Sequence, residues 1–103
     1  MDHYTVRFTT EASEDLLRLY QFILERNEDD WLIAEEALDA IRLAVKQLEL
    51  FPYNCRKVEA HNPYLRELII PFGNTGYVAL FDMEPDNIIT ILAVRHQRED
   101  DYN

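Results

Sequence analysis

The sequence predicts a single α+β domain in which an antiparallel helical hairpin packs on a small antiparallel β-sheet. Two observations lead to this prediction. Apolar residues recur at helical spacing in the first half of the chain, and strand-like segments replace them after Pro52. No linker, repeat or low-complexity segment interrupts the 103 residues, so residues 1–103 are expected to form one domain. Helices and strands in separate blocks are typical of the α+β class.

The beginning of the chain predicts a short N-terminal strand followed by an amphipathic helix. Residues 4–8 alternate large and polar side chains, as a short strand does. Thr9 and Thr10 then offer an N-cap, and acidic residues in the next turn favour the helix dipole. The helix is expected to end near Arg26, with an apolar face made by Ala12, Leu16, Leu19, Tyr20 and Ile23.

A second helix is expected from about Trp31 to Phe51, after a polar break at residues 27–30. Because Pro52 disfavours helical geometry in the residue before it, the helix should stop at Phe51. Two helices joined by a short polar link predict an antiparallel hairpin with facing apolar stripes. Trp31 and Tyr53 are expected to cap this hairpin as packed core residues.

The second half of the chain predicts an antiparallel sheet. Gly73 and Gly76 are expected to supply turn geometry between the first two main strands, and residues 84–87 should form a tight turn between the last two. Leu80 and Leu92 are expected in the core. The predicted strands cover residues 65–70, 77–83 and 88–94, with a short additional strand at 57–59.

The charge of the chain limits its partners. The net charge is −10, of which residues 1–53 carry −7 through twelve acidic and five basic side chains. An acidic half of this size repels phosphate backbones, so direct sequence-specific or broad DNA binding is not expected. No apolar run approaches membrane length, and the single cysteine, Cys55, indicates a reducing compartment. A cytoplasmic protein without a metal or other cofactor is therefore expected, since no metal-ligand spacing or phosphate loop is present.

One group of polar side chains is a candidate site. Arg66 lies on the first main strand of the sheet, and Arg95, His96, Arg98 and Tyr102 follow the end of the last. If those strands lie near one another, arginines suited to phosphate and an imidazole suited to proton transfer converge at one rim. The residues alone leave open the alternative that they form the solvated end of the sheet, paired with nearby carboxylates.

Several segments, in the same order along the chain, carry a resemblance to a known family: residues 4–12, 15–23, 48–52, 65–68 with 71–73, 76–78 and 92–102. In these segments the chain resembles toxins of the ParE/RelE superfamily and is closer to the ParE, or plasmid-stabilisation, branch. The fold of that superfamily, a helical hairpin on a small antiparallel sheet, agrees with the fold predicted from periodicity.

The resemblance implies the toxin of a type II toxin–antitoxin system. ParE-like members inhibit growth by poisoning DNA gyrase, which blocks replication, whereas RelE-like members are endoribonucleases that cut messenger RNA at the ribosome. In a nuclease, Arg66, Arg95 and His96 are the residues that match catalytic positions. Lys46 and Lys57 are the only lysines of this acidic chain, which favours the gyrase-directed branch. An inactive member that retains only partner binding is the remaining alternative.

The resemblance also implies a cognate antitoxin, ParD-like or a related small protein, that wraps the toxin. Leu17, Leu24 and Leu50 are the residues expected to receive its helix in an apolar groove. The alternative is that these leucines close the core of the chain itself or lie singly exposed.

Overall fold

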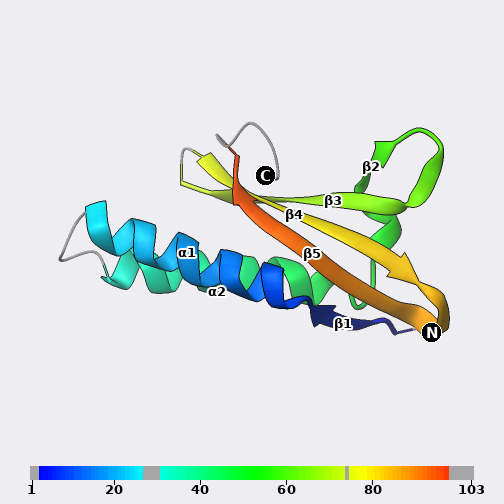
Figure 1. The fold of residues 1–103 in the computed structure, drawn as a ribbon, viewed down its shortest axis with the longest axis horizontal. Helices are drawn as coiled ribbons and strands as arrows, with labels where there is room; N and C mark the ends of the chain where they lie inside the picture. The colour runs from blue at the N-terminus through cyan, green and yellow to red at the C-terminus, as the bar shows by residue number, and fades with distance from the viewer. Residues whose placement is uncertain (1–2, 27–30, 74, 98–103) are drawn as a thin grey trace.

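The computed structural model describes residues 3–26, 31–73 and 75–97, which form two helices and five strands (Figure 1). The predicted N-terminal strand, helical hairpin and sheet are all present. In chain order the elements are β1 (Thr5–Phe8), α1 (Thr10–Arg26), α2 (Trp31–Gln47), β2 (Arg56–Glu59), β3 (Asn62–Phe72), β4 (Thr75–Glu84) and β5 (Ile88–His96), with short 3-10 turns η1 (Pro52–Asn54) and η2 (Pro85–Asn87).

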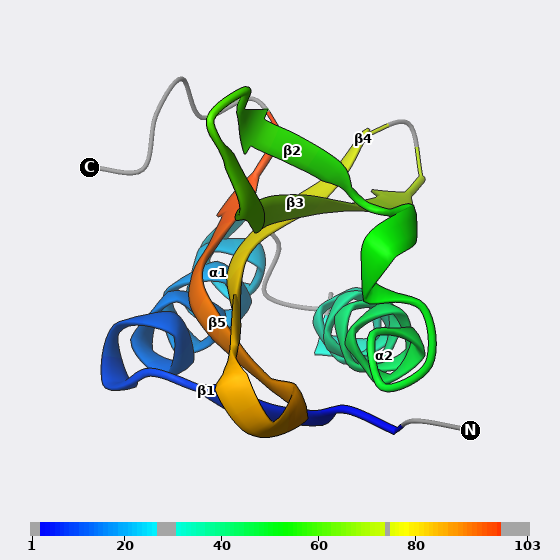
Figure 2. The same cartoon turned by 90° about the vertical axis from the view of Figure 1, so that its right-hand side faces the viewer.

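The sheet has the strand order β1-β5-β4-β3-β2. Strands β2 to β5 are antiparallel to their neighbours, as predicted, but β1 runs parallel to β5, with Thr5 opposite Ile88. The sheet is therefore mixed. Parallel neighbours need a long crossover connection, and here the helical hairpin and the strands after it separate β1 from β5 in sequence. Figure 2 shows β1 and β2 at opposite borders of the twisted sheet.

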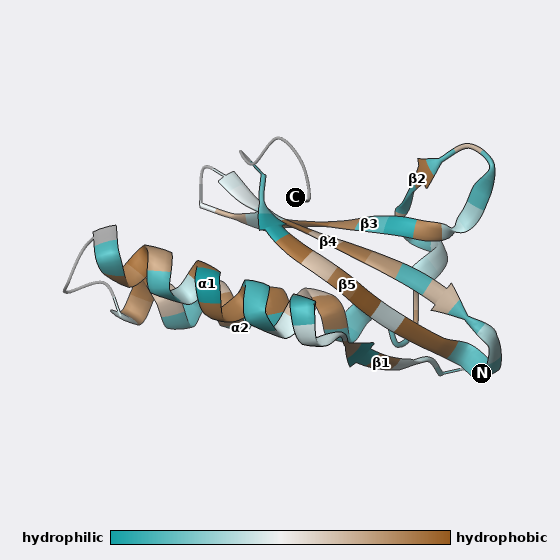
Figure 3. Cartoon of the chain, in the orientation of Figure 1, coloured by the Kyte–Doolittle hydropathy of each residue, from teal (hydrophilic) through white to brown (hydrophobic). Residues whose placement is uncertain are grey.

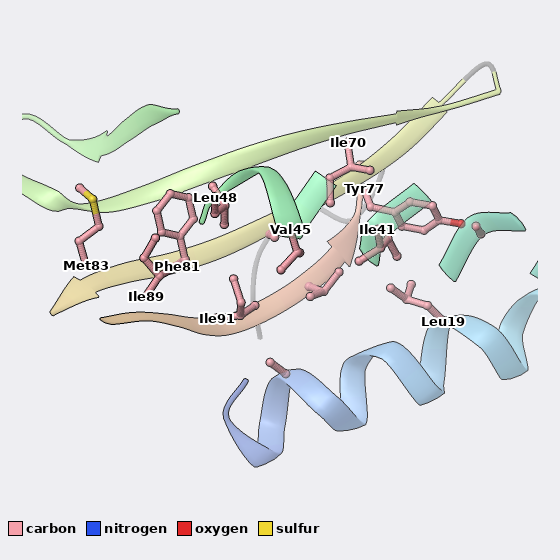
Figure 4. Packing of buried hydrophobic residues seen from close by; sticks show 14 residues of the cluster. Leu19, Ile41, Val45, Leu48, Ile70, Tyr77, Phe81, Met83, Ile89 and Ile91 are labelled. Atoms are coloured by element: carbon pink, nitrogen blue, oxygen red, sulfur yellow. The ribbon is translucent and has the colours of Figure 1, made fainter. Parts of the chain in front are cut away.

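The two faces of the sheet differ in what they contact. The inner face carries Tyr77, Ala79 and Phe81 of β4 and packs against the helices, whereas the outer face carries Val78 and Leu80. Figure 4 shows helix and strand side chains meeting in one interior, and Figure 3 shows apolar residues along much of β5. The main core residues are Ala12 and Leu19 of α1; Ile41 and Val45 of α2; Leu48; Ile70 of β3; Phe81 and Met83 of β4; and Ile89, Ile91 and Val94 of β5.

The start of α1 follows the sequence prediction, but the end of α2 does not. The Oγ1 atom of Thr9 accepts the Ala12 N–H at 3.0 Å, which is the expected N-cap. Helix α2 ends at Gln47 rather than at Phe51. The N–H groups of residues 48–50 bond to carbonyl groups three residues back, and the Glu49 carbonyl accepts the N–H of Tyr4. These contacts form a tighter turn between the end of α2 and Pro52.

Four side chains expected in the core lie elsewhere. Trp31 is 57% exposed and Tyr53 is 59% exposed, so neither is a packed cap of the hairpin. Leu80 is only partly buried because it lies on the outer face. Leu92 is also partly buried, since it is the extra residue where the β4–β5 register shifts between Leu80 and Phe81.

No helix in the described ranges has both the length and the apolar character needed to cross a membrane.

Candidate functional site

Arg95 and His96 end β5 and point to opposite faces of the sheet. Arg95 lies opposite Val78 on the outer face, and His96 lies opposite Tyr77 on the inner face. Consecutive side chains of a strand alternate in this way. The guanidinium and the imidazole therefore do not face a common ligand from one side of the sheet.

Arg66 is remote from both residues and is bound by the protein itself. It lies on the inner face opposite Phe81 and is only 8% exposed. Its Nε donates to the Pro63 carbonyl at 2.7 Å, and its Nη1 donates to the carbonyls of Tyr53 (3.2 Å) and Cys55 (2.8 Å). The predicted convergence of Arg66 with Arg95 and His96 at one rim is therefore wrong. The strand register explains this, because Arg66 lies opposite Phe81 and therefore points to the inner face of the sheet. There its hydrogen bonds join η1 to β3.

Arg98 and Tyr102, the two other residues predicted for the rim, lie outside the described residues.

Arg95 instead belongs to an ion-pair cluster on the outer face, which consists of Arg56, Glu67 and Arg95. The Glu67 carboxylate accepts from Arg56 Nε at 2.9 Å, and its other oxygen lies 3.9 Å from Arg95 Nη2. The Glu67 and Arg95 side chains are 11% and 15% exposed, whereas Arg56 is largely open to solvent. Arg56 and Glu67 were not predicted as site residues from the sequence. Their pairing follows from the strand register, since Arg56 on β2 lies directly opposite Glu67 on β3.

His96 has a fixed environment on the inner face. Its Nε2 shares a hydrogen bond with Thr75 Oγ1 at 3.1 Å, and its ring meets Tyr77 edge to face with centroids 5.6 Å apart. These contacts orient the imidazole at the end of β5. Arg95 contacts the backbone of His96, since its Nη1 donates to the His96 carbonyl at 3.3 Å. Arg66 lies opposite Phe81 on β3 and donates to carbonyls of Pro63, Tyr53 and Cys55.

The irregular part of β5 is held by the first turns of α1. The Val94 N–H donates to Asp15 Oδ2 at 2.9 Å, and Thr9 donates its hydroxyl to the Leu92 carbonyl at 3.3 Å. The Thr9 N–H also bonds to the Ile91 carbonyl. A bulge disrupts the regular ladder, and here helix residues satisfy the backbone groups that it displaces. Helix α1 therefore positions the segment that carries Arg95 and His96.

The other end of the outer face holds two carboxylates on β4. Glu84 accepts hydrogen bonds from Thr90 and from Arg7, and these contacts, led by the one with Thr90, lower the pKa of its carboxyl. Burial and the nearby Glu84 charge raise the pKa of Asp82. Glu84 is thus held as a structural anion, while Asp82 takes up a proton more readily than an ordinary aspartate.

Within the described ranges, no three histidine, cysteine, aspartate or glutamate residues gather as a metal site requires.

The leucines predicted to receive an antitoxin helix do not form one surface. Leu17 is 58% exposed and lines the hairpin groove, a groove between α1 and α2 of about 350 Å³. Leu24 is partly buried and Leu50 is exposed after the end of α2, and neither lines it. The residues that line the hairpin groove are Phe8, Leu16, Leu17, Tyr20, Glu35, Leu38, Ile41 and Arg42.

Comparisons with known proteins place this fold. A family model described as the ParE toxin of the type II toxin–antitoxin system, parDE, matches residues 6–101. A chain of the chromosomal ParDE TA system from P. aeruginosa superposes with a TM-score of 0.71 and 20% identity, covering 91% of this chain and 96% of that one. A chain of the toxin–antitoxin complex RelBE2 from Mycobacterium tuberculosis gives a TM-score of 0.59 and 24% identity, covering 91% and 98%. No curated protein matches the sequence.

Proposed function

Since this chain belongs to the ParE toxin family of type II toxin–antitoxin systems, we propose that it inhibits growth by binding DNA gyrase in the cytoplasm. A cognate antitoxin neutralises it. The observation that supports gyrase binding over RNA cleavage is that the Arg66 guanidinium is bound within the protein itself. A nuclease of this superfamily requires several cations and a proton donor around one phosphate, and Arg66 instead binds three carbonyl groups of its own chain.

The positions of Arg95 and His96, the other two candidate catalytic residues, also support gyrase binding over RNA cleavage. Arg95 and His96 lie on opposite faces of β5, and Arg95 Nη2 lies 3.9 Å from the Glu67 carboxylate. The described residues therefore do not bring a general base, a general acid and a pair of arginines together. A binding toxin needs no such assembly, because it acts through surface complementarity with its target.

The surface proposed to contact gyrase is the outer face around Arg56, Glu67 and Arg95. Arg56 presents an exposed guanidinium there, and Glu67 forms ion pairs with both arginines. Oriented charges at an interface steer association and fix register. Arg98 and Tyr102 follow β5 in sequence and remain proposed gyrase contacts.

The test is inhibition of gyrase supercoiling by the purified chain. Stoichiometric protein should block supercoiling and leave cleaved DNA, and Arg56→Ala should weaken inhibition. Arg42→Ala on α2, which removes an equally exposed arginine away from this face, is the matched control and should inhibit like wild type. Normal supercoiling in the presence of the wild-type chain would refute gyrase as the target. Messenger cleavage on translating ribosomes, detected by toeprinting, would establish the ribonuclease alternative in its place.

The antitoxin is proposed to place an apolar helix in the hairpin groove. Leu17 stands exposed at its border, while Leu16, Tyr20 and Leu38 form its partly buried walls. A groove of this kind suits the apolar face of an amphipathic helix. Leu17→Glu should therefore weaken neutralisation of growth inhibition in cells that express both proteins. Leu43→Glu on α2, equally exposed but outside the lining, should leave neutralisation unchanged.

A further inference from the structure

Strand β2 leaves one edge of the sheet open. It is the last strand in the order β1-β5-β4-β3-β2, and among the described strands it pairs with β3 alone. All four of its residues are exposed, and in Figure 2 β3 lies between β2 and the helices. An open edge carries main-chain N–H and C=O groups that can pair with a strand of another chain.

The side chains of β2 alternate regularly between the two faces of the sheet. Lys57 lies opposite Arg66 and Glu59 lies opposite Asn62, which is a step of two residues along β2 but of four along β3. The extra residues therefore belong to β3, and β2 keeps the alternation of a regular strand. Lys57 and Glu59 thus share the inner face, and Val58 between them points to the outer face.

The charges of Lys57 and Glu59 are not neutralised by their own chain. Within the part of the chain that the structure describes, neither side chain forms an ion pair. Lys57 instead lies opposite a second cation, Arg66. A lysine on an edge strand normally disfavours pairing with another strand. A carboxylate placed opposite Lys57 by an incoming strand would remove that obstacle.

A second copy of β2 supplies such a carboxylate in one register. When two identical antiparallel strands extend a sheet about a twofold axis, facing residues share a face, so the axis passes between two copies of one residue. An axis at Arg56, Lys57 or Glu59 places like charges directly opposite each other, which is destabilising. An axis at Val58 places the two valines opposite each other. In that register Lys57 of each copy lies opposite Glu59 of the other.

We propose that this chain forms a homodimer in which the β2 strands of two copies pair antiparallel about Val58. Two lysine–glutamate pairs and one valine pair accompany the main-chain hydrogen bonds between the edges. Because β2 is short, the interface is small and the association is weak and reversible. The axis is perpendicular to the sheet, so the two ion-pair clusters lie on the same side of the dimer. The proposal does not depend on which target the toxin attacks.

Sedimentation equilibrium of the purified full chain, from micromolar to millimolar concentration, tests the proposal. The wild-type chain should show a reversible monomer–dimer equilibrium. Glu59→Lys and Lys57→Glu should each raise the dissociation constant about tenfold or more, because both pairs then join like charges. The double variant, Lys57→Glu with Glu59→Lys, again places opposite charges face to face and should restore the wild-type dissociation constant.

Glu59→Lys also separates strand pairing from the effect of net charge. It changes the net charge of the chain from −10 to −8, since one negative charge is replaced by one positive charge. Repulsion between whole chains therefore falls, and net charge alone predicts tighter association. Glu36→Lys makes the same charge change at an exposed position of α2 and is the matched control. It should not weaken the dimer.

Three results would overturn the proposal: a wild-type chain that stays monomeric at millimolar concentration, tighter association of Glu59→Lys, or a double variant as weak as the single variants. Because the measurement uses the purified chain alone, its failure is distinct from a failure to inhibit gyrase.

Discussion

Replacing Arg66 with methionine should destabilise the fold strongly, although sequence reasoning treats this residue as part of a functional rim. Arg66 is 8% exposed, and its guanidinium donates to three carbonyl groups at 2.7, 2.8 and 3.2 Å. Methionine keeps much of the apolar volume but leaves these carbonyls without their donor. At about 1–2 kcal/mol for each of the three carbonyls left without its donor, the free energy of unfolding should fall by about 3–6 kcal/mol. Such a loss is a large part of the stability of a small domain.

Urea unfolding followed by far-UV circular dichroism measures this change. The midpoint should fall for Arg66→Met while the slope stays constant, since the same surface is exposed on unfolding. Arg42→Met is the matched control: this side chain is 65% exposed and, among the described residues, pairs with the exposed Asp39, so its effect should stay below about 1 kcal/mol. If Arg66→Met unfolds within about 1 kcal/mol of wild type, Arg66 does not hold η1 and β3 together, and the structural role assigned to it is incorrect.

Three further predictions concern the elements around the site. Asp15→Ala should lower stability by about 1–3 kcal/mol in urea unfolding because the Val94 N–H loses its acceptor, whereas Asp15→Asn should retain most of it; equal losses would contradict this role. Asp82→Asn should raise the thermal midpoint above that of wild type at pH 7, and this difference should vanish below about pH 4. The sign follows from the raised pKa of Asp82, whose ionisation as pH rises favours the unfolded state; a difference independent of pH would refute it. Gly76→Ala should cost at least about 1–3 kcal/mol, since a Cβ there would lie 2.3 Å from the Ile70 carbonyl oxygen; a midpoint equal to that of wild type would contradict this.

The elements of the fold were predictable because their signals are local. Helical spacing gave α1 and the start of α2, and Thr9 caps α1 as expected. The end of α2 was not predictable, since backbone contacts made by residues 48–50 decide it. The parallel pairing of β1 with β5 was missed for a similar reason, because no local pattern states which border of a sheet an N-terminal strand joins.

The candidate site was predicted in part. The end of β5 does carry Arg95 and His96, but simple strand alternation already required them to face opposite ways. The separation of Arg66 from both depends on the β3–β4 register, and the face of each β5 residue depends on the bulge at Leu92. A sequence pattern does not fix the position of a single extra residue in a strand. Arg56 and Glu67 were missed because their pairing is visible only once β2 is placed beside β3.

The pairing of β1 with β5 has a consequence for how the chain is made. Thr5 and Ile88 are joined in the same ladder, so the first strand of the nascent chain has no neighbour in the sheet until the last one has left the ribosome. Contacts between such distant segments slow folding, because a long loop must close before they form. A truncation that removes β5 also removes the sheet neighbour of β1. A partly synthesised chain therefore lacks the completed sheet.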